Sequence, residues 1–141
     1  MTSTPDREKE DRGLALPAGT RLTPQRQAVL DAIEATSGRF TALELFERAR
    51  RSSPRLGLAT TYRTLELLRQ TGSLHALSGE GRPAYVRCRP EHHHHLVCLS
   101  CGSVEDTELC ATPSQRDLTR RHGFQAKSHE LEIYGTCRRC A

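Results

Sequence analysis

Cysteine and histidine are the residues of this 141-residue chain whose types and spacing could do chemistry, and it has six cysteines and seven histidines. Four cysteines form two Cys-x-x-Cys pairs, Cys98 with Cys101 and Cys137 with Cys140, separated by the 35 residues from 102 to 136. Two such turns can present four thiolates to one tetrahedral zinc ion and leave no position open for a substrate. The spacing therefore predicts a structural zinc site, with a pair of disulfides or redox centres as the alternative.

The state of these thiols depends on the cellular compartment. Residues 1–13 are charged throughout and lack the apolar stretch of a signal peptide. No later stretch approaches the ~18 apolar residues that a membrane span needs. We therefore expect a cytoplasmic protein without a membrane partner, where Cys-x-x-Cys pairs more often bind metal than form structural disulfides.

A run of four histidines precedes the first cysteine pair. An expression tag is the simplest alternative explanation, but this run is short and internal. Successive side chains of an extended chain point to opposite sides, so His93 and His95 would face one way and His92 and His94 the other. The run therefore predicts that two metal sites share one strand.

A second histidine-bearing segment lies closer to the C-terminus. Charged and apolar residues alternate from 129 to 134, which predicts a strand that carries His129. A lone histidine on a strand is more often structural than metal-bound. The histidine run nonetheless makes His129 a candidate distal ligand.

The N-terminal half has the pattern of three helices and a hairpin. Thr23 and Pro24 form a helix cap and first turn, and the residues from Thr41 to Glu44 form a capping box. After Gly72 the pattern changes to that of strands around a glycine-rich turn, residues 78–82. The first expected helix spans about 24–36, the second begins at 41 and ends at the segment 51–54, and the third spans about 59–70. The expected strands span 73–77 and 83–88. This order is that of a winged helix-turn-helix, in which the last helix enters the major groove of DNA.

The third of these helices carries residues suited to nucleic acid near its N-terminus. They are Thr60, Thr61, Tyr62 and Arg63. Arginine can bind guanine through two hydrogen bonds, and a helix N-terminus favours phosphate. Residues 20–88 hold eleven arginines against six acidic residues, a net charge of +5, whereas residues 89–141 hold seven basic and seven acidic residues. These features predict contacts with DNA bases and phosphates, and the alternative is an amphipathic helix with Tyr62 in the core.

Four motifs occur in order along the chain and are specific as a set. They are Arg21-Leu-Thr-Pro-Gln-Arg26, Thr60-Thr-Tyr-Arg-Thr-Leu65, His92-His-His-His-Leu-Val-Cys-Leu-Ser-Cys-Gly102 and His129-Glu-Leu-Glu-Ile-Tyr-Gly-Thr-Cys-Arg-Arg-Cys140. Together they resemble the ferric uptake regulator family of metal-dependent repressors. The resemblance implies a homodimer that binds double-stranded operator DNA, and it adds Arg26 to the expected DNA-binding residues.

The resemblance also implies a domain organisation and an α+β fold. A winged helix-turn-helix DNA-binding domain over residues 20–88 is followed by a small α/β dimerisation domain with structural zinc over residues 89–141. A hinge joins them near residues 87–92. Residues 1–19 are polar, show no apolar period and are expected to form a disordered arm. Metal at the hinge would fix the spacing of two DNA-binding domains, which otherwise populate geometries that fit DNA poorly.

Within the family, the chain is most similar to the zinc uptake regulator branch because of Cys88. A thiolate ligand favours zinc over the harder iron and manganese ions. The resemblance implies a sensor site of Cys88, His93 and His95. Its fourth ligand would be His75, at a position where the branch usually has an aspartate.

The resemblance implies a second regulatory site on the other side of the histidine run. It would contain His92, His94, His129 and an acidic residue, for which Glu108 is the expected choice. Cys110 is an alternative to Glu108, and an absent or three-ligand site is a further one. The expected cofactor is therefore Zn²⁺, with two to three ions in each subunit.

The sequence thus predicts a zinc-dependent transcriptional repressor that controls zinc-uptake genes. The alternatives are an iron-, manganese- or peroxide-responsive repressor of the same family and a zinc-stabilised adaptor without a DNA target. No enzyme is expected, because the chain lacks the His-x-Glu and Pro-Cys-x-x-Cys units of zinc deaminases and because a four-cysteine site is closed to substrate. No small organic cofactor is expected either.

Overall fold

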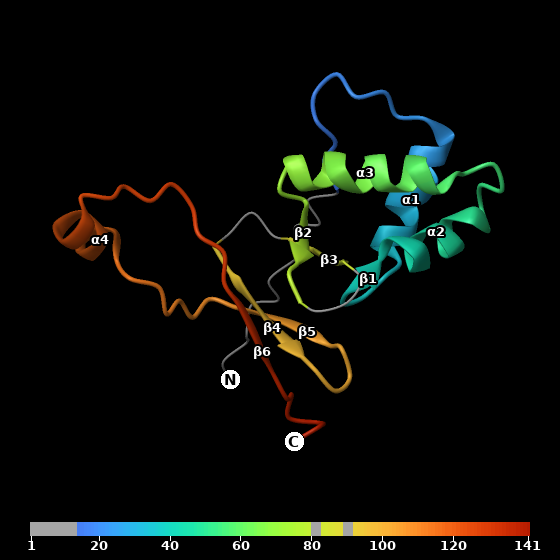
Figure 1. Ribbon diagram of the computed structural model, residues 1–141. Coiled ribbons are helices and arrows are strands. Elements are labelled where there is room, and N and C mark those ends of the chain that lie inside the picture. Colours follow the sequence, from blue (N-terminus) through green and yellow to red (C-terminus); the bar gives the residue numbers. More distant parts are fainter. Residues whose placement is uncertain (1–13, 80–82, 89–91) are drawn as a thin grey trace, which may run out of the picture.

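The computed structural model describes residues 14–79, 83–88 and 92–141 (Figure 1). It confirms an α+β fold with two lobes. In the N-terminal lobe, residues 14–79 and 83–88, three helices pack on a three-stranded sheet: α1 Pro24–Glu34, β1 Phe40–Thr41, α2 Ala42–Arg50, α3 Leu58–Gln70, β2 Leu74–Leu77 and β3 Ala84–Arg87. The C-terminal lobe, residues 92–141, contains a second sheet and one helix: β4 His94–Cys98, β5 Val104–Thr107, α4 Gln115–His122 and β6 Glu132–Gly135.

Side-chain caps determine where the first two helices begin. The hydroxyl of Thr23 accepts a hydrogen bond from the backbone N–H of Arg26 at 3.2 Å, and Pro24 occupies the first turn. The Thr41 hydroxyl accepts from the N–H of Glu44, while the Glu44 carboxylate accepts from the N–H of Thr41. These contacts confirm the predicted cap and capping box. Helix α1 ends at Glu34, two residues before the expected end.

A continuous apolar core holds the N-terminal lobe together. Its fully buried aliphatic side chains include Ile33, Leu45, Leu65 and Leu68. Phe40 on β1 stacks on Tyr85 of β3, with ring centroids 6.1 Å apart, and this pair joins the sheet to the helices. Burying one such side chain stabilises a fold by roughly 1.5–3 kcal/mol, so this lobe has a core that needs no ligand.

The first described residues also belong to this lobe, which corrects the expectation of a disordered arm as far as residue 19. Leu14 and Leu16 pack against the helical core. The backbone N–H of Ala15 donates to the hydroxyl of Ser73 at 3.1 Å, and the Ala15 carbonyl accepts from the hydroxyl of Thr71 at 2.7 Å. Two leucines in a polar segment are too few to show a period, so the sequence did not reveal this contact. Residues 1–13 of the predicted arm lie outside the described residues.

The sheet of the N-terminal lobe is antiparallel with strand order β1-β3-β2. Strands β2 and β3 confirm the two strands expected at 73–77 and 83–88 to within one residue at each end. Of the glycine-rich turn between them, residues 80–82 lie outside the described residues. Three helices followed by this hairpin make the predicted winged helix-turn-helix.

The sheet of the C-terminal lobe has the order β5-β4-β6, with β4 antiparallel to β5 and parallel to β6. His95 of β4 lies opposite Asp106 of β5 and opposite Glu132 of β6. Strand β6 begins at Glu132, so His129 precedes the strand that the alternation of residues 129–134 predicts. The chain between β5 and β6 leaves the sheet and carries α4 at a distance from it (Figure 1).

The two lobes meet where β2 and β3, the two strands of the wing, face the C-terminal sheet. Leu77 of β2, Val86 of β3 and Val97 of β4 form a small buried cluster. Beside it, Nε2 of His75 lies 2.7 Å from a carboxylate oxygen of Glu132. Within the described parts of the chain, no helix combines the length and apolar character needed to cross a bilayer.

Candidate metal centres and nucleic-acid interface

Cysteine and histidine side chains gather at three places in the described part of the chain. In each group, the sulfur and imidazole nitrogen atoms that could bind a metal all lie within 4.8 Å of one another. The groups are Cys98, Cys101, Cys137 and Cys140; Cys88, His93 and His95; and His92, His94, Cys110 and His129. Thiolates and imidazoles at such separations fit a borderline-soft divalent ion such as zinc.

The four-cysteine group forms at one end of the C-terminal sheet. Cys98 ends β4 and is buried, and Gly102 closes the first turn at a φ of +73°, a left-handed conformation that favours glycine. Sγ of Cys101 lies 3.7 Å from Sγ of Cys137. The chain therefore brings the four sulfur atoms together by its own turns, as the spacing predicts.

Backbone dipoles and thiol crowding act in opposite directions on this group. Backbone N–H groups of Cys101 and Cys137 lower the pKa of Cys98 to about 5, because they stabilise its thiolate. Hydrogen bonding with Cys137 and Cys101 raises the pKa of Cys140 to about 12. Four adjacent thiolates would repel one another, and a divalent cation is the group that removes this repulsion.

The second group lies at the junction between the lobes. Cys88 directly follows β3, and its Sγ lies 3.9 Å from Nε2 of His95 on β4. The rings of His93 and His95 are 4.9 Å apart. Burial lowers the pKa of His95, which favours the neutral imidazole that binds metals. Its other nitrogen, Nδ1, lies 3.1 Å from Asp106, which fixes the ring so that Nε2 faces Cys88.

The thiol of Cys88 is in a different environment from that of Cys98. Burial, followed by the charges of Asp106 and Glu130, raises the pKa of Cys88 to about 12. The thiol therefore keeps its proton at neutral pH. A metal that binds at this group must displace that proton, which couples binding to proton release.

His75 lies next to the second group but is not among its three members. Its ring stacks on that of His95 with centroids 5.0 Å apart, while its Nε2 faces Glu132. Burial alone would raise the pKa of Glu132, but hydrogen bonds from Tyr134, Ser78 and His75 outweigh it and lower the pKa to about 2. Glu132 is therefore a charged acceptor that orients His75 at the edge of the group.

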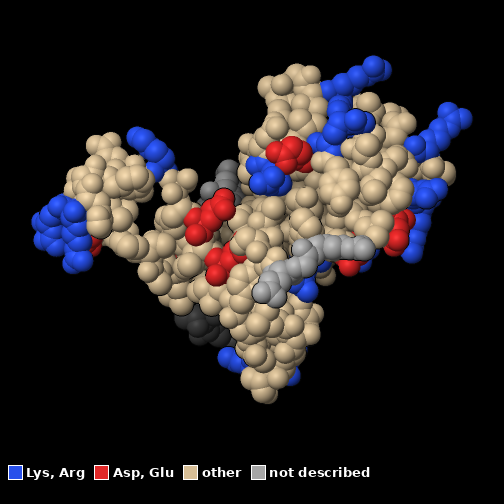
Figure 2. Space-filling view, in the orientation of Figure 1, with Lys and Arg blue, Asp and Glu red and all other residues tan. Residues whose placement is uncertain are grey.

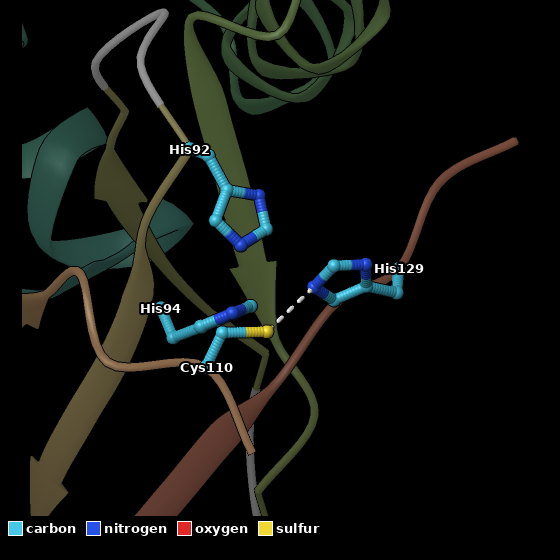
Figure 3. A group of neighbouring side chains, drawn as sticks. All are labelled: His92, His94, Cys110 and His129. Carbon is cyan, nitrogen blue, oxygen red and sulfur yellow. Dashed lines mark hydrogen bonds between the residues drawn. The ribbon is translucent and has the colours of Figure 1, made fainter. Parts of the chain in front are cut away.

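The third group, which Figure 3 shows, brings together His92, His94, Cys110 and His129. The ring of His92 is 4.6 Å from that of His94 and 4.7 Å from that of His129. Sγ of Cys110 lies 3.3 Å from Nε2 of His129. The structure thus brings Cys110 into this group, whereas the expected acidic residue, Glu108, is not part of it.

The two groups on β4 differ in the way that strand alternation requires. His93 and His95 lie with Cys88, and His92 and His94 lie with Cys110. The contacts of Asp106 and Glu132 can be found only from the strand register and the fold. Both residues lie on strands that pair with β4, opposite His95. The acidic residues in segments 104–107 and 129–134 are the only signal of these contacts that the sequence carries.

The exposed N-terminal end of α3 is the candidate nucleic-acid interface. The Tyr62 side chain is 49% exposed, so the alternative that places it in the core is wrong. Arg63 is also exposed, and its guanidinium donates to the Thr60 hydroxyl at 3.3 Å. Thr61 corrects the expectation for DNA contacts: it is fully buried and its hydroxyl donates to the Gly57 carbonyl at 3.2 Å. Adjacent residues of a helix point about 100° apart, so Thr61 faces the core while its neighbour Thr60 stays partly exposed.

Charge is distributed unevenly over the surface. Figure 2 shows Lys and Arg side chains extending from the helical lobe and from the α4 end of the molecule, with acidic side chains between these regions. Arg26 lies in the first turn of α1 and is half-buried, with its guanidinium donating to the carbonyl of Arg21. A basic helical lobe is suited to a polyanion.

A winged helix-turn-helix joined to groups of cysteine and histidine defines a metal-responsive transcription regulator. The model of the Ferric uptake regulator family matches residues 17–134, and the chain belongs to this family. Its members are regulators of transcription, so this chain is a regulator and not an enzyme.

Individual relatives agree with this assignment. The zinc uptake regulation protein of Mycobacterium tuberculosis is 42% identical over 129 residues, which cover 87% of this chain and 96% of the relative. The ferric uptake regulation protein of Bacillus subtilis is 35% identical over 126 residues, 85% of each chain. A solved structure of a zinc uptake regulator complexed with zinc and DNA superposes with a TM-score of 0.67 at 27% identity, covering 87% of this chain and 85% of that one.

Proposed function

We propose that this chain is a zinc-dependent repressor that binds operator DNA as a homodimer and controls zinc-uptake genes. The observation that carries the proposal is the group of Cys88, His93 and His95 at the junction between the lobes. A metal bound there is attached to the wing on one side and to the C-terminal sheet on the other. The angle between the lobes then depends on the metal.

The ligand chemistry favours zinc as the sensed metal. A thiolate with two imidazoles suits zinc better than iron or manganese, which prefer oxygen ligands. The 42% identity to a zinc uptake regulation protein supports the same choice. Asp106 holds the ring of His95 through Nδ1, the arrangement that orients metal-binding histidines in many proteins.

His75 is the proposed fourth ligand, and its position explains how the wing follows the metal. Its ring already contacts His95, and Glu132 accepts from its Nε2 side. A small shift of the imidazole would leave Glu132 bound to one nitrogen and free the other for the metal. Because His75 lies on β2 and Cys88 follows β3, both strands of the wing would then be held.

The DNA-reading residues that we propose are Arg26, Thr60, Tyr62 and Arg63, without Thr61. Tyr62 and Arg63 are exposed at the beginning of α3, where the helix N-terminus also favours phosphate. Arginine and tyrosine at this end can contact base edges and phosphates in a major groove. The two copies of α3 in a dimer would read two half-sites.

The C-terminal lobe is the proposed dimerisation domain, residues 89–141, and the DNA-binding domain is residues 20–88. Large apolar side chains of this lobe face solvent: Leu99 is 72% exposed, Leu109 81%, Phe124 59% and Ile133 44%. A small lobe with this much exposed apolar surface gains stability by covering it with a second copy. The four-cysteine group, with its zinc, would hold the sheet that presents this surface.

The test is a DNA-binding titration of the purified full chain against buffered zinc, iron(II), manganese and nickel. The proposal expects operator affinity to rise with zinc at lower free concentration than with the other three ions. A response to iron(II) or manganese without one to zinc would assign the chain to another branch of the family. Failure to bind operator DNA with any of the metals would contradict the repressor proposal.

A further inference from the structure

The segment from Cys110 to His129 is held differently from the rest of the C-terminal lobe. It leaves the sheet after β5, carries α4 and returns before β6 (Figure 1). None of the eight described residues of α4 is buried, so apolar packing does not hold this helix against the sheet. Its position depends on what fixes the two ends of the segment.

The middle of this segment, which we call the α4 arm (residues 111–128), is closed on itself. The Gln115 side chain donates to the carbonyl of Phe124 at 3.1 Å and accepts from the N–H of Ala126 at 3.0 Å. Gly123 ends the helix at a φ of +61°, a left-handed cap. These bonds give the arm a local shape but do not tie it to β4.

The ends of the arm meet at the third group. Cys110 and His129 come from the two ends, His94 is the first residue of β4, and His92 precedes it (Figure 3). His94 is 1% exposed, and its buried Nε2 has no hydrogen-bond partner among the described residues. A buried imidazole nitrogen without a partner costs free energy unless a ligand satisfies it.

We propose that His92, His94, Cys110 and His129 form a zinc site whose thiolate ligand is Cys110, and that this site anchors the α4 arm to β4. Three imidazoles and one thiolate complete a tetrahedral zinc shell. The inference rests on the proposed function in one respect, because the metal assigned to this site is also zinc. It replaces the acidic ligand expected at Glu108 with a sulfur atom.

The surroundings of Cys110 favour this assignment. The hydroxyl of Thr112 lies 2.9 Å from Sγ of Cys110, and Nε2 of His129 lies 3.3 Å from the same sulfur, so the sulfur faces the histidines. Glu108 lies within a turn in which the N–H of Leu109 donates to the Thr107 hydroxyl at 3.1 Å, and its carboxylate is not part of the group.

Metal at this site would close the arm as a loop. Because the metal-binding free energy is then spent partly on ordering the arm, the amides of residues 111–128 should exchange with solvent more slowly when zinc is bound. The second group, Cys88, His93 and His95, contains no residue from either end of the arm, so metal bound there does not close this loop. The arm thus reports on the third group alone.

The first measurement is the number of zinc ions that the purified full chain retains against a competing chelator, for the wild type, Cys110→Ser and the matched control Glu108→Gln. The wild type and Glu108→Gln should retain three ions in each subunit, one for each group. Cys110→Ser should retain two. In cobalt(II) titrations, the thiolate-to-cobalt absorption gained with the last equivalent should also disappear in Cys110→Ser.

The second measurement is hydrogen exchange of the arm with and without zinc. Exchange in residues 111–128 should slow about tenfold or more with zinc in the wild type and in Glu108→Gln, and should not change in Cys110→Ser or in His129→Gln, which removes the ligand at the other end. Full zinc retention by Cys110→Ser, with the same zinc-dependent slowing of exchange in the arm as in the wild type, would overturn the inference, as would loss of one ion in Glu108→Gln.

These results are separable from the proposed function. If the wild type retains three ions and protects the arm but does not bind operator DNA, the repressor proposal fails and the inference on Cys110 holds. If zinc-dependent DNA binding occurs while Cys110→Ser behaves as the wild type, the inference fails alone. Cys110 is exposed, so replacing it with Ser removes no buried contact. Hydrogen exchange of the N-terminal lobe that equals that of the wild type would show that Cys110→Ser is folded.

Discussion

The two lobes of this chain are stabilised in different ways. The N-terminal lobe has a continuous core of buried apolar side chains from three helices and a sheet. In the described residues 92–141, by contrast, the buried side chains are His94, His95, Val97 and Cys98. Three of these four belong to candidate metal groups. The comparison teaches that the same small chain relies on hydrophobic burial in its winged-helix lobe and on groups of candidate metal ligands in its C-terminal lobe.

Removal of the structural metal should have the largest effect. Replacing Cys137 with Ser, or stripping zinc with a strong chelator, should unfold the C-terminal lobe and leave the N-terminal lobe folded, because structural zinc contributes on the order of 10 kcal/mol in small domains. Hydrogen exchange resolved along the chain measures this difference. A cooperative loss of both lobes would contradict the comparison.

A core truncation in the N-terminal lobe should have the next largest effect. Leu65→Ala should lower the free energy of unfolding of this lobe by about 2–5 kcal/mol, because Leu65 is fully buried. Leu43→Ala is the matched control, since that side chain is 38% exposed and should cost about 0.5 kcal/mol or less. Denaturant unfolding of both variants measures the contrast, and equal costs would show that α2 and α3 do not pack as described.

A smaller effect is expected where the lobes meet. Glu132→Gln removes the charge that accepts from His75, Ser78 and Tyr134 and should destabilise the junction by about 1–3 kcal/mol. Glu130→Gln, at a side chain that is 79% exposed against 9% for Glu132, should change stability by less than about 0.5 kcal/mol. Thermal unfolding of Glu132→Gln and Glu130→Gln measures this contrast. Equal stability of the two variants would show that the contacts of Glu132 do not hold the wing to the sheet.

The DNA-reading end of α3 should respond to mutation without loss of stability. Arg63→Ala should weaken specific operator binding by roughly 1–3 kcal/mol, while the unfolding free energy of the exposed position changes little. Arg116→Ala removes an equivalent charge from α4 in the other lobe and serves as the control. If both variants lose operator affinity equally, Arg63 acts only through net charge.

Most of the fold followed from local sequence signals, and their limits are physical. The caps at Thr23 and Thr41 and the strands beside the glycine-rich turn are local, so they were predicted to within two residues. The alternation of side chains along a strand predicted that His93 and His95 would separate from His92 and His94. Local patterns carry such information because they depend on neighbouring residues alone.

Other features depend on how distant segments meet. The burial of Thr61 follows from the phase of α3 against the core, and its hydroxyl looks as suitable for DNA as that of Thr60. Cys110 rather than Glu108 reaches the histidines because of the turn after β5. Asp106 meets His95 through strand register, which one sequence does not specify.

The central claim is that metal at the junction between the lobes controls DNA binding, and Cys88→Ser tests it most directly. Operator affinity of the wild type and of this variant is measured by fluorescence anisotropy over a range of buffered zinc. The account predicts that zinc raises the affinity of the wild type at least tenfold and leaves that of Cys88→Ser unchanged, while both keep the zinc of the four-cysteine group. Equal zinc dependence of the two proteins, or tight operator binding by the metal-free wild type, would contradict it.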